Sequence, residues 1–224
     1  MMSAMPRLAP LALALGLGSW LGVLGRGGEP LTVCCAGDSL IRPTPVHLKA
    51  IAAAAGESLR VLEWAQGGLN ADTYRGFFRR LRAEGRESRC QAVFLQLGTN
   101  DAVPVLEGRE TADEFKRRFG EVVAGFQAFP GIGRPSPALF VATIPRFCEG
   151  PASEAKNEVV ETVLNPIVRE AAAAAGATVV DNHAVLKDRP DLYDPDCVHP
   201  NAAGERALAE SWWRALKSSA KGPR

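Results

Sequence analysis

The stretch LTVCCAGDSLIR, residues 31–42, decides the predicted fold. Residues 31–36 form an almost continuous apolar run, which is typical of a strand that is buried on both faces. Gly37 permits a sharp turn after this strand. Asp38 and Ser39 then fall at the carboxyl edge of the sheet, where open α/β sheets bind their ligands. From this stretch alone, a purely structural role as caps of the next helix remains open for both side chains.

Outward from this stretch, short apolar runs alternate with longer amphipathic runs along the chain. The alternation predicts βαβ units and a parallel sheet, and therefore one three-layer α/β/α domain over residues 29–217. The longest helix is expected to bend at Asn165-Pro166, because proline interrupts helical hydrogen bonding. Residues 218–224 are predicted to be a disordered tail. The predicted strands are 31–36, 59–64, 91–97, 138–144 and 177–180, and the predicted helices are 45–55, 73–83, 112–129, 154–175 and 201–217.

Residues 1–28 differ in character from the rest of the chain. Arg7 precedes an apolar run over residues 8–24, which predicts a secretory signal peptide. An uncleaved N-terminal membrane anchor is the first alternative, since the run is near the lower length limit for a spanning helix. A mispredicted start or a disordered extension is the second. A signal peptide or an anchor would place the domain in the secretory pathway or outside the cell, where disulfides can form.

The composition narrows the classes of function. The 224 residues are 46% apolar, enough for a substantial core, and the net charge is +1. Without a basic cluster the sequence indicates no nucleic-acid partner. The chain contains three histidines, at 47, 183 and 199, which limits the groups available for acid–base chemistry at neutral pH. We expect His47 and His183 to be structural.

Polar motifs follow the predicted strands. GDS follows the first strand, GGLNADT (67–73) the second, GTND (98–101) the third, and DPDCVHPNAAG (194–204) comes after the fifth. In a parallel sheet these loops converge on one edge. A hydroxyl nucleophile needs a base, and the base needs an orienting carboxylate. Asp196 and His199 are three residues apart, which lets the carboxylate reach Nδ1 while Nε2 faces outward, and Asp194 is the alternative carboxylate.

These four motifs resemble those of the SGNH hydrolases, also called the GDSL esterase/lipase family, over nearly all of the chain after Glu29. The resemblance implies a flavodoxin-like, five-stranded parallel sheet with strand order 2-1-3-4-5. It also implies a serine esterase that hydrolyses a small acyl ester through an acyl-enzyme, with no metal or other cofactor. Carried over by position, Ser39 is the nucleophile, His199 the base and Asp196 its partner, and the oxyanion hole consists of Ser39, Ala71 and Asn100.

Two departures from the family pattern concern the substrate. Ala71 stands where the family has a glycine, and we expect its methyl group to narrow the acyl side of the pocket. Ile41-Arg42-Pro43 replaces the common Thr-x-Gly after GDS. The substrate therefore stays open between a carbohydrate acetyl ester, a short-chain alkyl or aryl ester and a lysophospholipid, and transfer of the acyl group to an alcohol is a further possibility.

Two other classes of function compete with the esterase. The GTND and DxxH motifs with Asp38 offer oxygen and nitrogen ligands for a metal-dependent phosphoesterase. A non-catalytic binding domain of the same fold is the other alternative. Asp38 and Asp101 are expected to be structural in the esterase interpretation.

Five cysteines are present, at 34, 35, 90, 148 and 197. Cys148 and Cys197 both fall on loops at the predicted active-site edge, so an exported protein could join them in a disulfide. In that interpretation Cys34, Cys35 and Cys90 stay as thiols. Five free cysteines are the alternative, because the sequence does not give the distance between Cα atoms.

Overall fold

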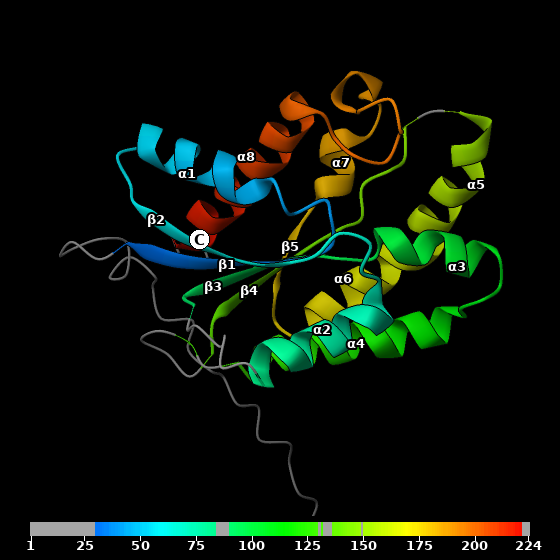
Figure 1. Cartoon of the computed structure of the whole chain (residues 1–224), viewed down its shortest axis with the longest axis horizontal. Helices are drawn as coiled ribbons and strands as arrows, with labels where there is room; N and C mark the ends of the chain where they lie inside the picture. Colours follow the sequence, from blue (N-terminus) through cyan, green and yellow to red (C-terminus); the bar gives the residue numbers. More distant parts are fainter. Residues whose placement is uncertain (1–29, 84–89, 130, 132–135, 149, 221–224) are drawn as a thin grey trace, which may run out of the picture.

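The structure is a computed structural model that describes residues 30–83, 90–129, 131, 136–148 and 150–220. Within these residues five parallel strands form one sheet in the order β2-β1-β3-β4-β5, as predicted (Figure 1). The predicted signal peptide or anchor, residues 1–28, lies outside the described residues. The strands are β1 (Leu31–Gly37), β2 (Leu59–Ala65), β3 (Ala92–Gln96), β4 (Ala138–Ala142) and β5 (Thr178–Val180).

Strand β1 lies inside the sheet, between β2 and β3. All of its residues are buried, and so are all of those in β3, because helices cover both faces of the sheet. The edge strands β2 and β5 contain exposed positions. Since the strands are parallel, the residues that follow β1 and β3 meet at one edge of the sheet.

The helices form two layers. Helices α1 and α8 pack together on one face of the sheet, and α2, α4 and α6 lie on the other (Figure 1). On the first face Trp212 stacks on Phe94 with ring centroids 4.7 Å apart, so Trp212 is a packing residue. The helices are α1 (Thr44–Ala54), α2 (Ala71–Ala83), α3 (Ala102–Leu106), α4 (Ala112–Gln127), α5 (Pro151–Val159), α6 (Asn165–Ala174), α7 (Asn182–Leu186) and α8 (Ala202–Ala220).

The predicted long helix 154–175 is interrupted before Asn165. Helix α5 passes into a π-helical turn, Val160–Leu164, and α6 then begins with Pro166 in its first turn. Pro166 has no N–H to donate, so the wider π-helical turn lies where the regular α-helical hydrogen bonds cannot continue. The Asn165 side chain instead bonds the backbone of Ile144, with Oδ1 accepting from its N–H at 2.7 Å and Nδ2 donating to its carbonyl at 3.0 Å.

The C-terminal helix is longer than predicted. Helix α8 continues to Ala220, so residues 218–220 belong to the helix and not to a disordered tail. The hydroxyl of Ser219 donates to the carbonyl of Leu216 at 2.8 Å, which satisfies one of the acceptors in the last turn. The rest of the predicted tail, residues 221–224, lies outside the described residues.

The cysteine prediction is wrong for one pair. Cys34 and Cys90 form a disulfide with Cα atoms 6.1 Å apart, although both were expected to stay as thiols. Successive residues of a strand face opposite sides of the sheet. Cys34 therefore points into the same apolar cluster as Cys90, whereas Cys35 points into the cluster on the other face and is a free thiol.

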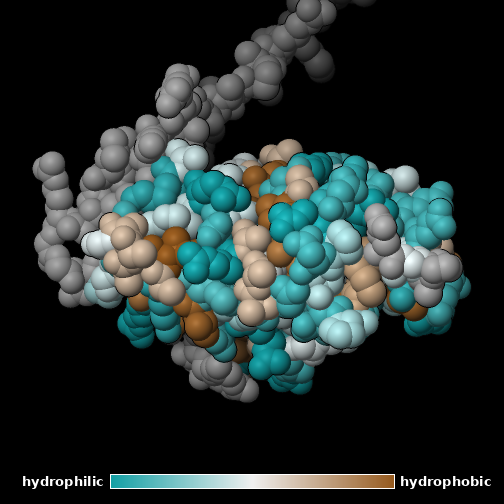
Figure 2. Space-filling model, turned by 90° about the horizontal axis from the view of Figure 1, so that it is seen from above, coloured by the Kyte–Doolittle hydropathy of each residue, from teal (hydrophilic) through white to brown (hydrophobic). Residues whose placement is uncertain are grey.

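The surface seen in Figure 2 is mainly hydrophilic, with hydrophobic residues in small scattered groups. Among the described residues, the large hydrophobic side chains that are exposed are Val46 and Leu106. None of the helices in the described ranges combines the length and apolar character that crossing a bilayer requires.

Candidate active site

Ser39 lies in the turn that leaves β1. Gly37 ends the strand with φ of 138°, and a side chain there would overlap the carbonyl oxygen of Gln96 on β3. The chain can therefore run this close to its neighbour β3 only with glycine at this position. The N–H of Asp38 donates to the same carbonyl at 3.0 Å, and the next residue, Ser39, is half-buried at the carboxyl edge of the sheet.

The hydroxyl of Ser39 meets His199, which lies 160 positions later in the sequence. Nε2 of His199 is 2.9 Å from Ser39 Oγ, and Nδ1 is 2.6 Å from Oδ2 of Asp196. A neutral imidazole that donates from Nδ1 to the carboxylate leaves Nε2 as the acceptor for the serine hydroxyl. The structure thus brings Ser39, His199 and Asp196 into one hydrogen-bonded chain.

Asp196 is fixed within its own turn. Its Oδ1 accepts the backbone N–H groups of Val198 and His199, each at 2.9 Å. The side-chain bond to His199 lowers the pKa of Asp196 most, and these two backbone bonds lower it further. The pKa is about 2, so the carboxylate is ionised at neutral pH. Asp194 contributes through its backbone: its N–H donates to the carbonyl of His199 at 2.8 Å. The structure therefore selects Asp196, not Asp194, as the carboxylate that contacts His199.

The loop that carries Asp196 and His199 is closed at its base. Tyr193 and Pro200 form an antiparallel bridge, and Asn201 donates its side-chain amide to the carbonyls of Asp191 and Tyr193 at 2.8 and 3.2 Å. The Tyr193 hydroxyl donates to the carbonyl of Arg146, on the chain after β4. The loop is thus held to α8 on one side and to the β4–α5 connection on the other.

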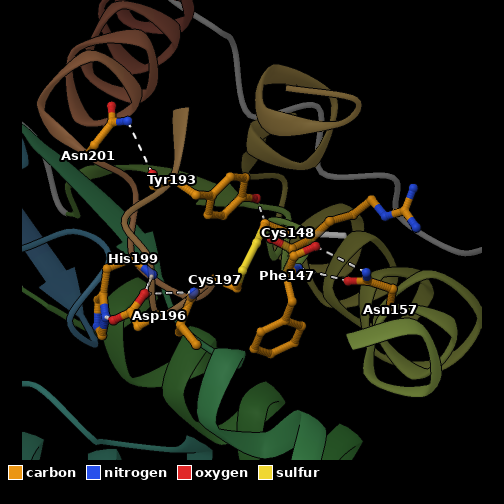
Figure 3. Close-up of a disulfide and its surroundings, with 10 residues drawn as sticks. Phe147, Cys148, Asn157, Tyr193, Asp196, Cys197, His199 and Asn201 are labelled. Atoms are coloured by element: carbon orange, nitrogen blue, oxygen red, sulfur yellow. Dashed lines mark hydrogen bonds and ion pairs between the residues drawn. A yellow bond between two sulfur atoms is a disulfide. The ribbon is translucent and has the colours of Figure 1, made fainter. Parts of the chain in front are cut away.

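A disulfide between Cys148 and Cys197 joins this loop to the β4–α5 connection, which decides between the two possibilities that the sequence left open for this pair (Figure 3). The Cα atoms are 4.7 Å apart, and the N–H of Cys148 donates to the carbonyl of Cys197 at 3.0 Å. Cys197 has φ of 60°, in the left-handed region, at the tip of the turn. On the other side, Asn157 clamps Phe147 by bonding both its N–H and its carbonyl, at 2.8 and 3.1 Å. The disulfide therefore ties the turn that carries Asp196 and His199 to a braced segment.

Asn100 lies in the short 3-10 helix Thr99–Asp101 after β3. Its Nδ2 donates to the carbonyl of Leu69 at 2.9 Å, and the side chain is partly buried. An amide nitrogen carries two hydrogens, so this bond fixes the orientation of the amide and leaves its second hydrogen for another acceptor.

The structure differs from the prediction at Ala71. Its N–H, expected in the oxyanion hole, donates to both carboxyl oxygens of Asp101, at 3.0 and 3.1 Å. Helix α2 begins two residues earlier than predicted because Asn70 caps it through a reciprocal pair of bonds with Thr73. Ala71 then occupies the first helical position, and its methyl group is buried in the apolar core instead of narrowing an acyl pocket.

Three carboxyl groups are buried beneath these loops. Asp38 is fully buried, and burial raises its pKa to about 6 although the N–H of Leu40 donates to its Oδ1 at 3.0 Å. Asp101 is buried next to Glu110, and both burial and that second carboxyl group raise the pKa of Asp101. Glu110 pairs with Arg118, whose Nη1 lies 2.6 Å from Oε1.

Sequence reasoning did not find the role of Glu110 and Arg118. Both lie in the charged stretch GRETADEFKRRF, where a solvent-exposed helix face is the ordinary interpretation. His47 and His183, expected to be structural, contact Glu205 and the backbone of Ile144. Across the described part of the chain, no group of three or more His, Cys, Asp or Glu side chains is arranged to hold a metal ion.

A serine activated by a histidine–carboxylate pair, at the edge of a parallel sheet in this strand order, defines a serine hydrolase type of site. The chain belongs to the GDSL-like Lipase/Acylhydrolase family, whose model matches residues 35–207. The resemblance to the SGNH, or GDSL, hydrolases is thereby confirmed.

Individual relatives are distant. Over 141 residues, 56% of this chain, the sequence is 26% identical to an acetylxylan esterase of Xylanibacter ruminicola, and the match spans only 28% of that protein's length. Two solved structures share the fold, each at 19% identity. The lipase/acylhydrolase from Enterococcus faecalis has a TM-score of 0.68, with 87% of this chain and 99% of that chain covered. The acetylxylan esterase Axe2 from Geobacillus stearothermophilus has a TM-score of 0.63, with 84% and 95% covered.

Proposed function

We propose that the protein is a serine esterase that cleaves small acyl esters through a covalent acyl-enzyme. The observation that carries this proposal is the chain of hydrogen bonds from Ser39 Oγ to His199 Nε2 and from His199 Nδ1 to Asp196 Oδ2. In this arrangement the imidazole takes the serine proton, and the ionised carboxylate stabilises the imidazolium that forms.

The proposed reaction has two steps, acylation of Ser39 and hydrolysis of the acyl-enzyme. Ser39 Oγ bonds to the ester carbonyl carbon while its proton passes to His199 Nε2, and the carbon–oxygen bond to the alcohol then breaks as that alcohol takes the proton. In the second step, water gives a proton to Nε2 and attacks the acyl carbon. The bond between the acyl carbon and Ser39 Oγ then breaks, the acid is released, and the proton on Nε2 passes to Ser39 Oγ. An alcohol in place of water would give transfer of the acyl group.

The oxyanion hole is proposed to consist of the backbone N–H of Ser39 and the second amide hydrogen of Asn100. The bond from Asn100 to the carbonyl of Leu69 holds the amide in place before the reaction. Donors fixed in this way stabilise the negative charge that develops on the carbonyl oxygen without having to reorganise. Ala71 is not included, because its N–H is bonded to Asp101.

For the substrate we propose an acetyl or other short acyl ester, with a carbohydrate acetyl ester as the first choice. Two of the relatives above are described as acetylxylan esterases. Within the described residues, the exposed large hydrophobic side chains are isolated and form no broad apolar face for a long acyl chain. We also propose export from the cytoplasm, and the two disulfides support it.

The decisive experiment is a panel of chromogenic esters of increasing acyl length, assayed with the parent protein and Ser39→Ala. The parent should prefer acetate, Ser39→Ala should be inactive while folded, and a serine-directed phosphonate should inhibit the parent whereas EDTA should not. Inhibition by EDTA together with turnover of a phosphate ester would favour the metal-dependent phosphoesterase. No turnover of any ester would favour a binding domain. Sequencing the amino terminus of secreted protein would test the signal peptide.

A further inference from the structure

Asp101, the last residue of the 3-10 helix Thr99–Asp101, links this helix to the segment 69–71, and the two segments together position Asn100 of the proposed oxyanion hole. It accepts the N–H of Ala71, and its neighbour Asn100 donates to the carbonyl of Leu69. These bonds run in opposite directions between the 3-10 helix Thr99–Asp101 and the segment 69–71. Each bond therefore limits the movement that the other would allow, so losing the Asp101 bond should loosen the segment to which the Asn100 amide is bonded.

Glu110 lies against the other side of Asp101. It is 3% exposed, and its Oε1 accepts from Arg118. Its carboxyl group is close enough to Asp101 to raise the pKa of Asp101. Oε2 of Glu110 is buried, and among the described residues no group donates to it. Two ionised carboxylates are both acceptors, but a proton on Asp101 would supply the missing donor.

The surrounding charges favour that position for the proton. Arg118, on α4, is the cation beside Glu110, so the negative charge is better placed on Glu110 than on Asp101. Asp38, at the end of β1, raises the pKa of Asp101 by like-charge repulsion, in addition to the larger effect of burial. Asp72 on α2 lies 3.5 Å from Arg118 Nε and shares the same cation.

We propose that Asp101 is a positioning residue of the oxyanion hole and acts as a neutral acid, accepting the Ala71 N–H and donating its proton to Glu110. The inference rests on the proposed esterase function. Asparagine has the same shape and offers both an acceptor and a donor, so it should replace a neutral Asp101. A merely structural carboxylate would not show this preference for the amide.

The first test compares Asp101→Asn, Asp101→Ala and the control Asp113→Ala in the full chain, using a chromogenic acetate ester. Asp113 is exposed in the first turn of α4, and its side chain makes no hydrogen bond or ion pair within the described ranges. Asp101→Ala should lower kcat by roughly 10- to 100-fold, with KM little changed, because a displaced donor weakens transition-state binding. Asp101→Asn should stay within about threefold of the parent, and the control should equal the parent.

A second measurement serves if Asp101→Ala does not fold. At neutral pH the parent should show the infrared carbonyl stretch of a protonated carboxylic acid, and Asp101→Asn should lack it. A parent without this band overturns the proposal, and so does an Asp101→Asn variant with a loss of kcat as large as that of Asn100→Ala. If the parent hydrolyses no ester, the esterase proposal fails, and the infrared band still reports on Asp101.

Discussion

Removing the Cys148–Cys197 disulfide should slow the esterase much more than removing Cys34–Cys90, although the two bonds should stabilise the fold about equally. They close loops of nearly the same length, with sequence separations of 49 and 56 residues. In the chain-entropy model each contributes about 4 kcal/mol to the free energy of unfolding at 25 °C. The two disulfides therefore contribute about equally to the free energy of unfolding, and they differ in their place in the structure.

The two disulfides differ in how close they lie to the turn that carries Asp196 and His199. Cys197 is adjacent to Asp196 and two residues before His199, whereas Cys34 and Cys90 are buried in the core. Without its disulfide the turn keeps the backbone bond from Cys148 to Cys197 but loses its covalent link to the braced segment 147–148. A displacement of Nε2 by a fraction of an ångström should lower kcat/KM by roughly tenfold.

The assay compares Cys148→Ala/Cys197→Ala with Cys34→Ala/Cys90→Ala. Urea denaturation gives the free energy of unfolding, and kcat/KM on an acetate ester is measured well below both thermal midpoints. Non-reducing peptide mapping of the secreted parent first verifies both pairs. The reasoning is refuted if the two double variants lose kcat/KM to the same extent, or if the Cys148 and Cys197 peptides are alkylated without reduction.

Three further changes follow from the structure. Asn100→Ala should lower kcat by roughly 10²- to 10³-fold with little change in KM, and a raised KM with unchanged kcat in steady-state assays would instead make Asn100 a binding residue. Asp38 binds its proton more tightly in the folded than in the unfolded state, so stability should fall by up to about 3 kcal/mol as the pH rises from about 4 through 6. Urea denaturation of Asp38→Asn should lack that decline. Gly204→Ala should cost about 1–3 kcal/mol, since the methyl group would overlap the carbonyl of Leu192, and an unchanged thermal midpoint would contradict this.

The sequence predicts the features that depend on local pattern. The apolar run before Gly37 places β1, and the spacing of Asp196 and His199 indicates that the two side chains meet within one turn. Strand order and the meeting of Ser39 with His199 come from the family resemblance and from the rule that parallel strands end at one edge.

The features that the sequence does not predict depend on burial. Glu110 resembles a surface charge, and only the folded structure shows that it is buried near Asp101. Adjacent cysteines in a strand face opposite sides, but the sequence does not indicate that Cys34, and not Cys35, faces Cys90. The first residue of α2 depends on the choice of Asn70 as the cap, which also decides the partner of the Ala71 N–H.

The hydrogen bonds that orient Asp196 toward His199 lie within one short turn: the carboxylate bonds two backbone N–H groups and the imidazole, all within residues 196–199. Only the approach of His199 to Ser39 depends on the rest of the domain. The way in which the imidazole and the carboxylate face each other therefore depends on few residues outside this turn. For protein engineering, a graft of residues 193–201 into another scaffold of this fold would also have to supply a partner cysteine for Cys197.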